Sequence, residues 1–409
     1  MKRKKIKISF AIVLILLCCL SNVLGASYIY KSNQKERQTD ESSIATSVST
    51  PVFEFQSESQ ILMEASTGKI IYANNEDERL LPASVTKIMT LLLIMEQIDS
   101  GKLSYDDKVT CSTNASSMGG SQIWFKENEE LTIDEALKAI CVVSANDVTV
   151  AMAEKIGGTE ANFVNMMNEK AKSLGMNNTN FMNSHGIDEE NHYTTAKDIA
   201  IMSRELITKH PDILKYTSIW MDTLRNGEFG LSSTNKLIRF YEGANGLKTG
   251  STSQALFNLS GSATRNGTTF ISVIMRAPSS DIRLQETKQL LDYGFANYEN
   301  KTLYEKDTVI DTLEISKNIT DKLDVIVKEE VSVLNEKGKN IETSENITYR
   351  ELKAPILEGE VVGNIEIINQ SNGEVIENLD LIAKNNIDRS SFIDYLKKVF
   401  KMFIMSNQV

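Results

Sequence analysis

The stretch Leu81-Pro82-Ala83-Ser84-Val85-Thr86-Lys87-Ile88-Met89-Thr90 predicts a helix that begins close to Ser84. Ser84 and Lys87 are three residues apart, so they lie on the same face of that helix. The next residues, Leu91 to Met95, are apolar on every face, which indicates that the helix is buried in a core. A serine beside a neutral lysine can act as a nucleophile if its surroundings lower the pKa of the lysine. The pattern is common by chance, and a capping serine with a solvated lysine is the alternative.

Two motifs further along the chain supply the partners that such a helix needs. Ser144-Ala145-Asn146 follows an apolar helix that we expect to end at Val143, and Lys248-Thr249-Gly250 lies on a predicted strand. Taken singly, the first is typical of a helix end or cap and the second is an ordinary strand. Their joint occurrence after S-x-x-K, in this order and within the length of one domain, is a specific pattern.

With this triple signature the sequence resembles the penicillin-recognising serine acyl-transfer enzymes. It is most similar to the low-molecular-mass penicillin-binding proteins that act as D-alanyl-D-alanine carboxypeptidases, and the resemblance covers residues 53–405. The supporting stretches are Ser117–Gln122, Ser184–Asp188, Asn235–Leu237 and Gly246–Gly250. The resemblance implies an exported enzyme that removes the terminal D-alanine from peptidoglycan stem peptides, without a cofactor or a metal. Lys or diaminopimelate would precede the two D-alanines in these peptides.

The resemblance also implies a role for each residue of the three motifs. Ser84 attacks the carbonyl between the two D-alanines, and Lys87 takes its proton. Burial and the second cation, Lys248, are expected to lower the pKa of Lys87. Ser144 would relay a proton to the leaving amine, and Asn146 would hold the substrate amide.

Six residues are expected to bind the substrate: Lys248, Thr249, Gly250, Ser251, Arg283 and His185. The tetrahedral oxyanion needs two donors, which would be the backbone N–H groups of Ser84 and Ser251. Lys248 and Thr249 would attract the terminal carboxylate, assisted by Arg283. Arg283 could instead form an ion pair on a helix surface. The part of His185 in deacylation is a suggestion, and it could simply hold the following turn.

Two other functions remain open, a β-lactamase or esterase of the same fold and a non-catalytic cell-wall-binding scaffold. No E-x-x-L-N-like segment lies between Asn146 and Lys248, which argues against a class A β-lactamase. β-Lactams are therefore expected to be slowly released covalent inhibitors. One departure from the family is Leu256, which stands where the family has a glycine that permits close backbone approach. Leu256 is expected to affect the rate and the substrate range of the enzyme more than its type of reaction.

The order of the predicted elements indicates an α+β fold. A strand pair, Ile61–Ala65 and Lys69–Ala73, comes first, and mostly helical sequence follows to about residue 225. Strands return at Leu247–Thr252 and continue through a hairpin turn at Asn266-Gly267, before a helix at about 280–298. This order predicts helices packed on one mainly antiparallel sheet, and the resemblance implies that the unit is a β-lactamase/transpeptidase-like domain with a helical subdomain. A small all-β domain and a C-terminal amphipathic helix would follow it.

Composition, together with the family resemblance, divides the chain into five expected segments. They are a signal peptide at 1–26, a linker at 27–50, a penicillin-binding carboxypeptidase catalytic domain at 51–300, an all-β domain at 303–385 and an amphipathic membrane-anchoring helix at 387–409. A basic run and the apolar segment Ile8–Leu20 predict export, with cleavage before Ala26 or, alternatively, an uncleaved anchor. These features predict a location at the extracytoplasmic face of the bacterial cell membrane.

The C-terminal tail is expected to bind a membrane surface. Its apolar residues fall on one helical face and its lysines toward the other. A helix docked on the all-β domain is the alternative. The two clusters are Phe392, Leu396, Val399, Phe400 and Phe403 against Lys397, Lys398 and Lys401.

The charge of the chain argues against nucleic acid as a partner. The formal net charge is -11, and five basic residues lie before position 8. The rest of the chain is therefore still more acidic, whereas phosphate binding needs clustered Lys and Arg. Cys111 and Cys141 are interpreted as free and structural, although a disulfide remains possible outside the cytoplasm.

Overall fold

The computed structural model describes residues 53–315, 322–339 and 341–389, together with positions 391, 393 and 396. The predicted signal peptide, the linker up to residue 50 and almost all of the predicted tail helix lie outside the described residues. Within the described part, no helix is both long enough and apolar enough to span a bilayer.

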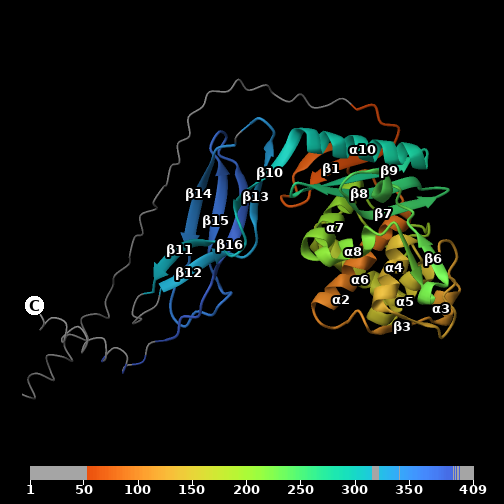
Figure 1. Ribbon diagram of the computed structural model, residues 1–409, viewed down its shortest axis with the longest axis horizontal. Coiled ribbons are helices and arrows are strands. Elements are labelled where there is room, and N and C mark those ends of the chain that lie inside the picture. Colours follow the sequence, from red (N-terminus) through yellow and green to blue (C-terminus); the bar gives the residue numbers. More distant parts are fainter. Residues whose placement is uncertain are drawn as a thin grey trace, which may run out of the picture.

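An antiparallel five-stranded sheet forms the centre of the first unit, in the order β2-β1-β9-β8-β7 (Figure 1). The chain's first strands join its late strands, because β1 pairs with β9 along its whole length. The predicted single antiparallel sheet is thus confirmed, as are both hairpins. The strands are β1 (Ser59–Glu64), β2 (Ile70–Asn74), β7 (Ala244–Thr252), β8 (Leu256–Arg265) and β9 (Thr268–Ala277).

Both faces of this sheet are buried, and successive side chains along a strand enter different cores. Ile61 belongs to the core shared with the helical subdomain, whereas Leu62 belongs to the core beneath α10 (Ser280–Asn297). Figure 1 shows α10 along one side of the sheet and the helical subdomain on the other. The apolar run after Lys87 lies inside the larger core, because every residue from Lys87 to Met95 is buried.

The helical subdomain is less continuous than predicted. The apolar helix α4 (Ile133–Val142) has its C-cap at Val143, where its end was expected, and Ser144 follows with a positive φ of 65°. Two small sheets interrupt the subdomain: β3 (Lys108–Thr110) with β4 (Glu130–Thr132), and β5 (Met221–Leu224) with β6 (Phe229–Ser232). The helices are η1 (Ala83–Thr86), α2 (Lys87–Asp99), α3 (Thr113–Ser116), α4 (Ile133–Val142), α5 (Asn146–Gly157), α6 (Glu160–Ser173), α7 (Ala196–Lys209), η2 (Pro211–Ile213), α8 (Leu214–Thr217), η3 (Arg225–Gly227) and α9 (Leu237–Phe240).

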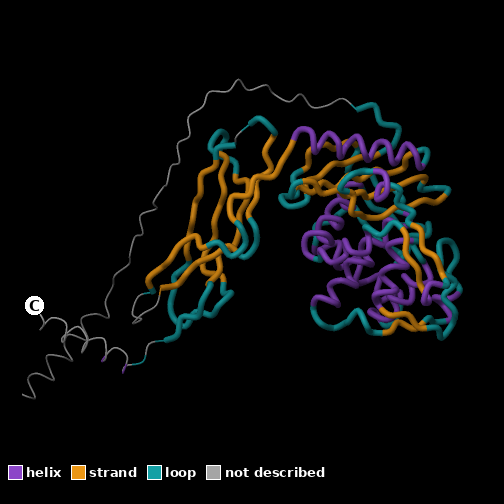
Figure 2. The backbone as a smooth tube through the Cα atoms, in the orientation of Figure 1, coloured by secondary structure: helices purple, strands orange, loops and turns teal. Residues whose placement is uncertain are grey.

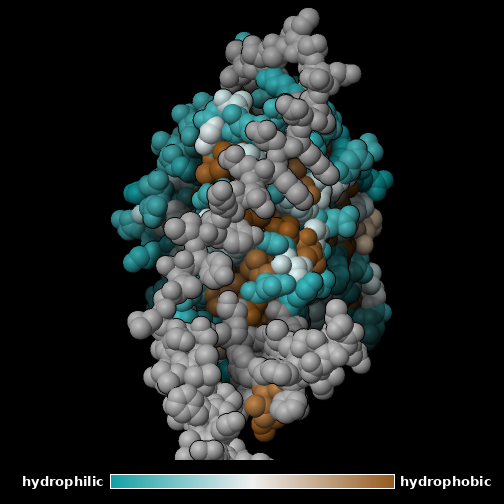
Figure 3. Space-filling view, turned by 90° about the vertical axis from the view of Figure 1, so that its left-hand side faces the viewer, coloured by the Kyte–Doolittle hydropathy of each residue, from teal (hydrophilic) through white to brown (hydrophobic). Residues whose placement is uncertain are grey.

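In the second unit the described residues from 298 to 389 form strands joined by loops, as Figure 2 shows. Its first strand continues directly from α10 and pairs with β13, while the other strands form a five-stranded sheet in the order β11-β12-β16-β15-β14. Viewed from this end, hydrophobic surface lies among hydrophilic side chains (Figure 3). The strands are β10 (Tyr298–Tyr304), β11 (Val309–Glu314), β12 (Lys322–Val327), β13 (Val331–Glu336), β14 (Thr343–Tyr349), β15 (Val361–Asn369) and β16 (Val375–Ala383).

Leu256 begins β8 with a left-handed backbone, at φ 54°. This conformation brings Cβ close to the following carbonyl oxygen and costs an L-residue about 1–2 kcal/mol, whereas glycine avoids the penalty. The family's glycine at this position is therefore explained by backbone conformation, in addition to the close approach that the sequence suggested.

We predict that Leu256→Gly is more stable than Leu256→Ala by about 1 kcal/mol, because both lose the leucine side chain but only alanine keeps the left-handed penalty. Chemical denaturation of the two variants measures the difference in the free energy of unfolding. Equal stability, or a more stable alanine variant, would contradict a left-handed backbone at this position.

Candidate active site

The segment that carries Ser84, the predicted nucleophile, lies between the sheet and the helical subdomain. Ser84 lies in the single turn η1, directly before α2, and β7 packs against that turn. A Cβ on Gly250 would lie 2.8 Å from the carbonyl oxygen of Pro82 and 2.9 Å from the backbone nitrogen of Ser84. The glycine of the K-T-G motif is therefore what allows this strand to reach the serine.

Lys87 is the hub of the site and is fully buried. Its Nζ lies 3.1 Å from Ser84 Oγ, 2.7 Å from Asn146 Oδ1 and 2.6 Å from the carbonyl oxygen of His185. These three partners come from the turn η1, the start of α5 and the loop between α6 and α7. One amine thus joins three segments that are distant in sequence.

The surroundings of Lys87 disfavour its cation. Burial holds the pKa of Lys87 well below its usual range, and the charge of Lys248 lowers it further, while Asp147 opposes both. Burial is the largest of these influences. A buried ammonium loses its hydration, so the neutral amine is the favoured form.

The S-x-N motif occupies the break between α4 and α5. Ser144 is 3% exposed, and its Oγ has no hydrogen-bond partner among the described residues. Asn146 accepts from Lys87 and donates from Nδ2 to the carbonyl oxygen of Gly119 at 2.7 Å. The carboxylate of Asp147 accepts the N–H group of Phe125 and so holds the same loop. Sequence reasoning gave Asp147 no function.

The K-T-G residues line the strand side of the site. Lys248 is 1% exposed and donates to the carbonyl oxygen of Thr249 at 3.0 Å. Burial lowers the pKa of Lys248 to about 7, with a smaller lowering from the charge of Arg283. The Thr249 hydroxyl lies 2.7 Å from that of Thr234, and Ser251 is exposed at the end of the motif.

Arg283 lies in the first turn of α10 and is only 8% exposed, so it is not a helix-surface residue. Its Nη1 donates to the carbonyl oxygen of Asn258 at 3.2 Å, and its Nε has no partner within the described part of the chain. Burial lowers the pKa of Arg283 to about 10. The Asn258 side chain in turn donates to the carbonyl oxygens of Leu81 and Pro82, just before the nucleophile turn.

His185 contributes its backbone to the site more than its ring. Its carbonyl accepts from Lys87, while its Nδ1 accepts the N–H group of Ile187 at 3.2 Å. Burial, helped by the charge of Lys87, lowers the pKa of His185 to about 3, so the ring is neutral at neutral pH. A role for the ring in deacylation stays a prediction.

The loop of residues 177–195 contacts the segment from Ala83 to Thr90 at several points that the sequence did not predict. Thr90 donates to the carbonyl oxygen of Ser184 at 2.6 Å. His192 accepts an N–H group at Nδ1, so its proton is on Nε2, which lies 2.8 Å from Thr86 Oγ1. A Cβ on Gly186 would overlap the carbonyl of Ala83, so only glycine fits there. Such irregular contacts carry no periodic signal.

Comparisons with known proteins agree with this arrangement. A family model described as "D-alanyl-D-alanine carboxypeptidase" matches residues 44–279, and one described as "Penicillin-binding protein 5, C-terminal domain" matches residues 298–389. The chain is 40% identical over 348 residues to D-alanyl-D-alanine carboxypeptidase DacF of Bacillus subtilis (strain 168). The aligned region covers 84% of this chain and 89% of that protein.

Solved structures give the same result. The chain is similar to penicillin-binding protein 5 of Haemophilus influenzae, with a TM-score of 0.68, 31% identity, and coverage of 84% of this chain and 100% of that one. It is also similar to penicillin-binding protein D2 of Listeria monocytogenes in its ampicillin-bound form, with a TM-score of 0.55, 30% identity, and coverage of 60% and 100%. The chain therefore belongs to the D-alanyl-D-alanine carboxypeptidase family of low-molecular-mass penicillin-binding proteins.

Proposed function

We propose that Ser84 is the nucleophile with which this serine-type D-alanyl-D-alanine carboxypeptidase forms its acyl-enzyme. The observation that carries the proposal is the set of contacts around Lys87. A neutral lysine has two N–H groups and one lone pair. Asn146 Oδ1 and the His185 carbonyl, at 2.7 and 2.6 Å, can accept the two N–H groups. The lone pair then faces the Ser84 hydroxyl at 3.1 Å and can take its proton.

The oxyanion of the tetrahedral intermediate would be held by two backbone N–H groups, those of Ser84 and Ser251. The close approach of β7 at Gly250 supports this assignment, since it brings the strand against the backbone nitrogen of Ser84. Preformed donors of this kind stabilise the charge that develops on the oxygen during attack.

Collapse of that intermediate breaks the bond to the terminal D-alanine and leaves an ester on Ser84. The leaving amine needs a proton, which Lys87 has just taken. Ser144 would relay this proton, and its buried, unpartnered Oγ supports the assignment, because a relay hydroxyl must be free to exchange hydrogen bonds. Asn146 would hold the substrate amide while remaining bonded to Lys87.

The terminal carboxylate of the substrate would lie against Lys248 and Thr249, with Arg283 behind them. Both cations are almost fully buried, at 1% and 8% exposure, so a carboxylate that enters the site would offset two poorly solvated charges. Such a subsite selects peptides with a free C-terminus, which is the requirement for a carboxypeptidase.

Water would then hydrolyse the ester and release the shortened peptide. β-Lactams would acylate Ser84 in the same way, in line with the ampicillin-bound form of the Listeria protein. The natural substrates would be peptidoglycan stem peptides ending in D-Ala-D-Ala, at the extracytoplasmic face of the cell membrane. The predicted N-terminal signal and tail helix would bring the enzyme to that face.

We predict that Ser84→Ala lowers D-alanine release from a diacyl-L-Lys-D-Ala-D-Ala peptide by about 10³-fold or more, because no acyl-enzyme can form. Ser218→Ala, at an exposed serine, is the matched control and should leave release unchanged. Mass spectrometry of the wild type with penicillin should locate the adduct on the peptide that contains Ser84. Equal release from Ser84→Ala and wild type, or an adduct elsewhere, would refute the assignment.

The pH dependence of kcat/KM is expected to be bell-shaped. On the acid side activity falls as Lys87 gains a proton. Because the pKa of Lys87 is lowered, this fall occurs at a pH well below the one at which a free lysine gains its proton. On the alkaline side activity falls as Lys248, whose pKa burial lowers to about 7, loses the charge that attracts the carboxylate.

Lys248→Arg tests the assignment of the alkaline limb, because the guanidinium stays charged throughout. Rates of D-alanine release across the pH range should show the alkaline limb moving to higher pH while the acid limb stays. An alkaline limb that is unchanged in a folded Lys248→Arg variant would assign that limb to another group.

A further inference from the structure

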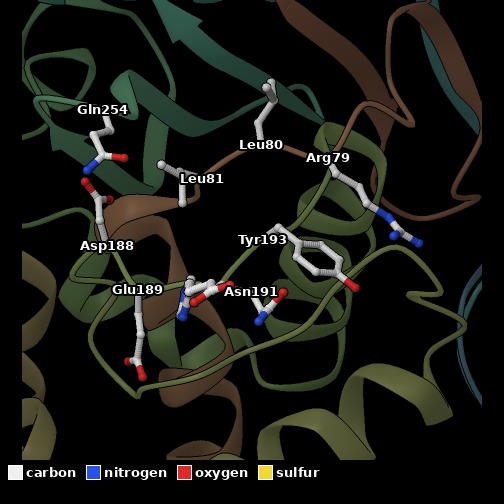
Figure 4. A pocket seen from close by; sticks show the side chains of 10 residues that line it. Arg79, Leu80, Leu81, Asp188, Glu189, Asn191, Tyr193 and Gln254 are labelled. Carbon is white, nitrogen blue, oxygen red and sulfur yellow. The ribbon is translucent and has the colours of Figure 1, made fainter.

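A cavity of about 540 Å³ lies beside the nucleophile turn, outside the three motifs. Its walls come from the segment just before the turn, from the loop between α6 and α7, and from the turn after β7 (Figure 4). In the close-up, Asp188 and Gln254 extend toward each other at one end, with Leu81 between the segments that carry them. The cavity therefore reaches Leu81, three residues before Ser84, without containing a residue proposed for the chemistry.

The cavity lies in the direction in which the acyl part of the substrate must extend. In the proposed function the substrate's carboxylate is at Lys248 and Thr249, and its scissile carbonyl is between Ser84 and Ser251. The remaining peptide then continues along β7 toward Thr252, where the strand ends. Gln254, on the cavity wall, lies in the turn that follows β7, and three residues separate it from Ser251 by no more than about 10 Å.

The residue before D-Ala-D-Ala can reach this distance. Its Cα lies about two residues, or about 7 Å, from the terminal residue of an extended peptide, and a long side chain adds several ångströms. The cavity can accommodate such a side chain, since its volume is several times that of an aminobutyl group.

Carboxylates dominate the charged groups of the wall. Asp188, Glu189 and Glu190 lie in succession along it, and Arg79 is the cation among the lining residues. The Arg79 guanidinium already donates to Asn178 and stacks over the Tyr193 ring, at 4.8 Å from its centroid. In Figure 4 it lies at the opposite end of the cavity from Asp188.

Asp188 gives independent support for a cationic ligand. Its Oδ1 is buried and has no hydrogen-bond partner among the described residues. A buried acceptor without a partner costs about 1–3 kcal/mol, more for a charged group. An ammonium bound beside this carboxylate would supply both a donor and an opposite charge, whereas a neutral donor would supply the weaker, uncharged hydrogen bond.

We propose that this cavity is a subsite for the side-chain amine of the residue that precedes D-Ala-D-Ala, with Asp188 as its main determinant. The proposal rests on the proposed function, because the position of the scissile bond fixes the direction of the peptide. Glu190, which is exposed at the rim, adds negative charge that attracts the amine.

The test compares two peptides that differ only at the lysine side chain. One is diacetyl-L-Lys-D-Ala-D-Ala, in which the ε-amine is acetylated, and the other is Nα-acetyl-L-Lys-D-Ala-D-Ala, in which the ε-amine is free. D-alanine release from wild type should give a kcat/KM about 10-fold higher for the free amine, and this preference should weaken with added salt. Asp188→Asn should abolish the preference by slowing the free-amine peptide alone. Asp106→Asn, an exposed carboxylate outside the cavity, should keep it.

The outcomes separate this proposal from the proposed function. No D-alanine from either peptide would refute the proposed function, whereas equal rates for both peptides in wild type would overturn only the subsite. Equal slowing of both peptides by Asp188→Asn would also overturn it. Glu190→Lys, a charge reversal at the rim, should selectively slow the free-amine peptide and serves if Asp188→Asn does not fold.

Discussion

The whole arrangement depends on keeping one lysine amine buried and correctly oriented. Lys87 makes contacts of 3.1 Å or less with Ser84 in the turn η1, with α5 and with the loop between α6 and α7. The sheet supplies a second cation, Lys248, but burial has the larger influence on the pKa of Lys87. The helical subdomain therefore determines the state of this amine as much as the motifs do, since it removes water from the amine.

Two glycines set how tightly the turn before Lys87 is enclosed. Gly250 on β7 and Gly186 on the opposite loop both approach η1 so closely that a Cβ would overlap its backbone. The backbone of the turn is thus enclosed by the strand and by the loop. A site held by backbone approach is more precisely positioned than one held by flexible side chains.

Much of this was predictable from the sequence, because the motifs and the strand periodicity have strong local signals. The antiparallel sheet, the Asn266-Gly267 hairpin and the buried helix after Lys87 follow from pattern alone. The contacts of the loop of residues 177–195 with the turn η1 and α2 could not be predicted, since they use carbonyl groups and isolated polar side chains. The left-handed backbone at Ser144 and Leu256 was also missed, because neither residue type favours it.

The pairing of β1 with β9 also bears on when the chain can fold. β1 ends at Glu64, whereas β9 begins only at Thr268, so the central strand pair joins segments about two hundred residues apart. The sheet cannot close until nearly all of the first unit has left the ribosome. Transport through a membrane channel requires an unfolded chain, so this late closure of the sheet is compatible with the predicted signal peptide.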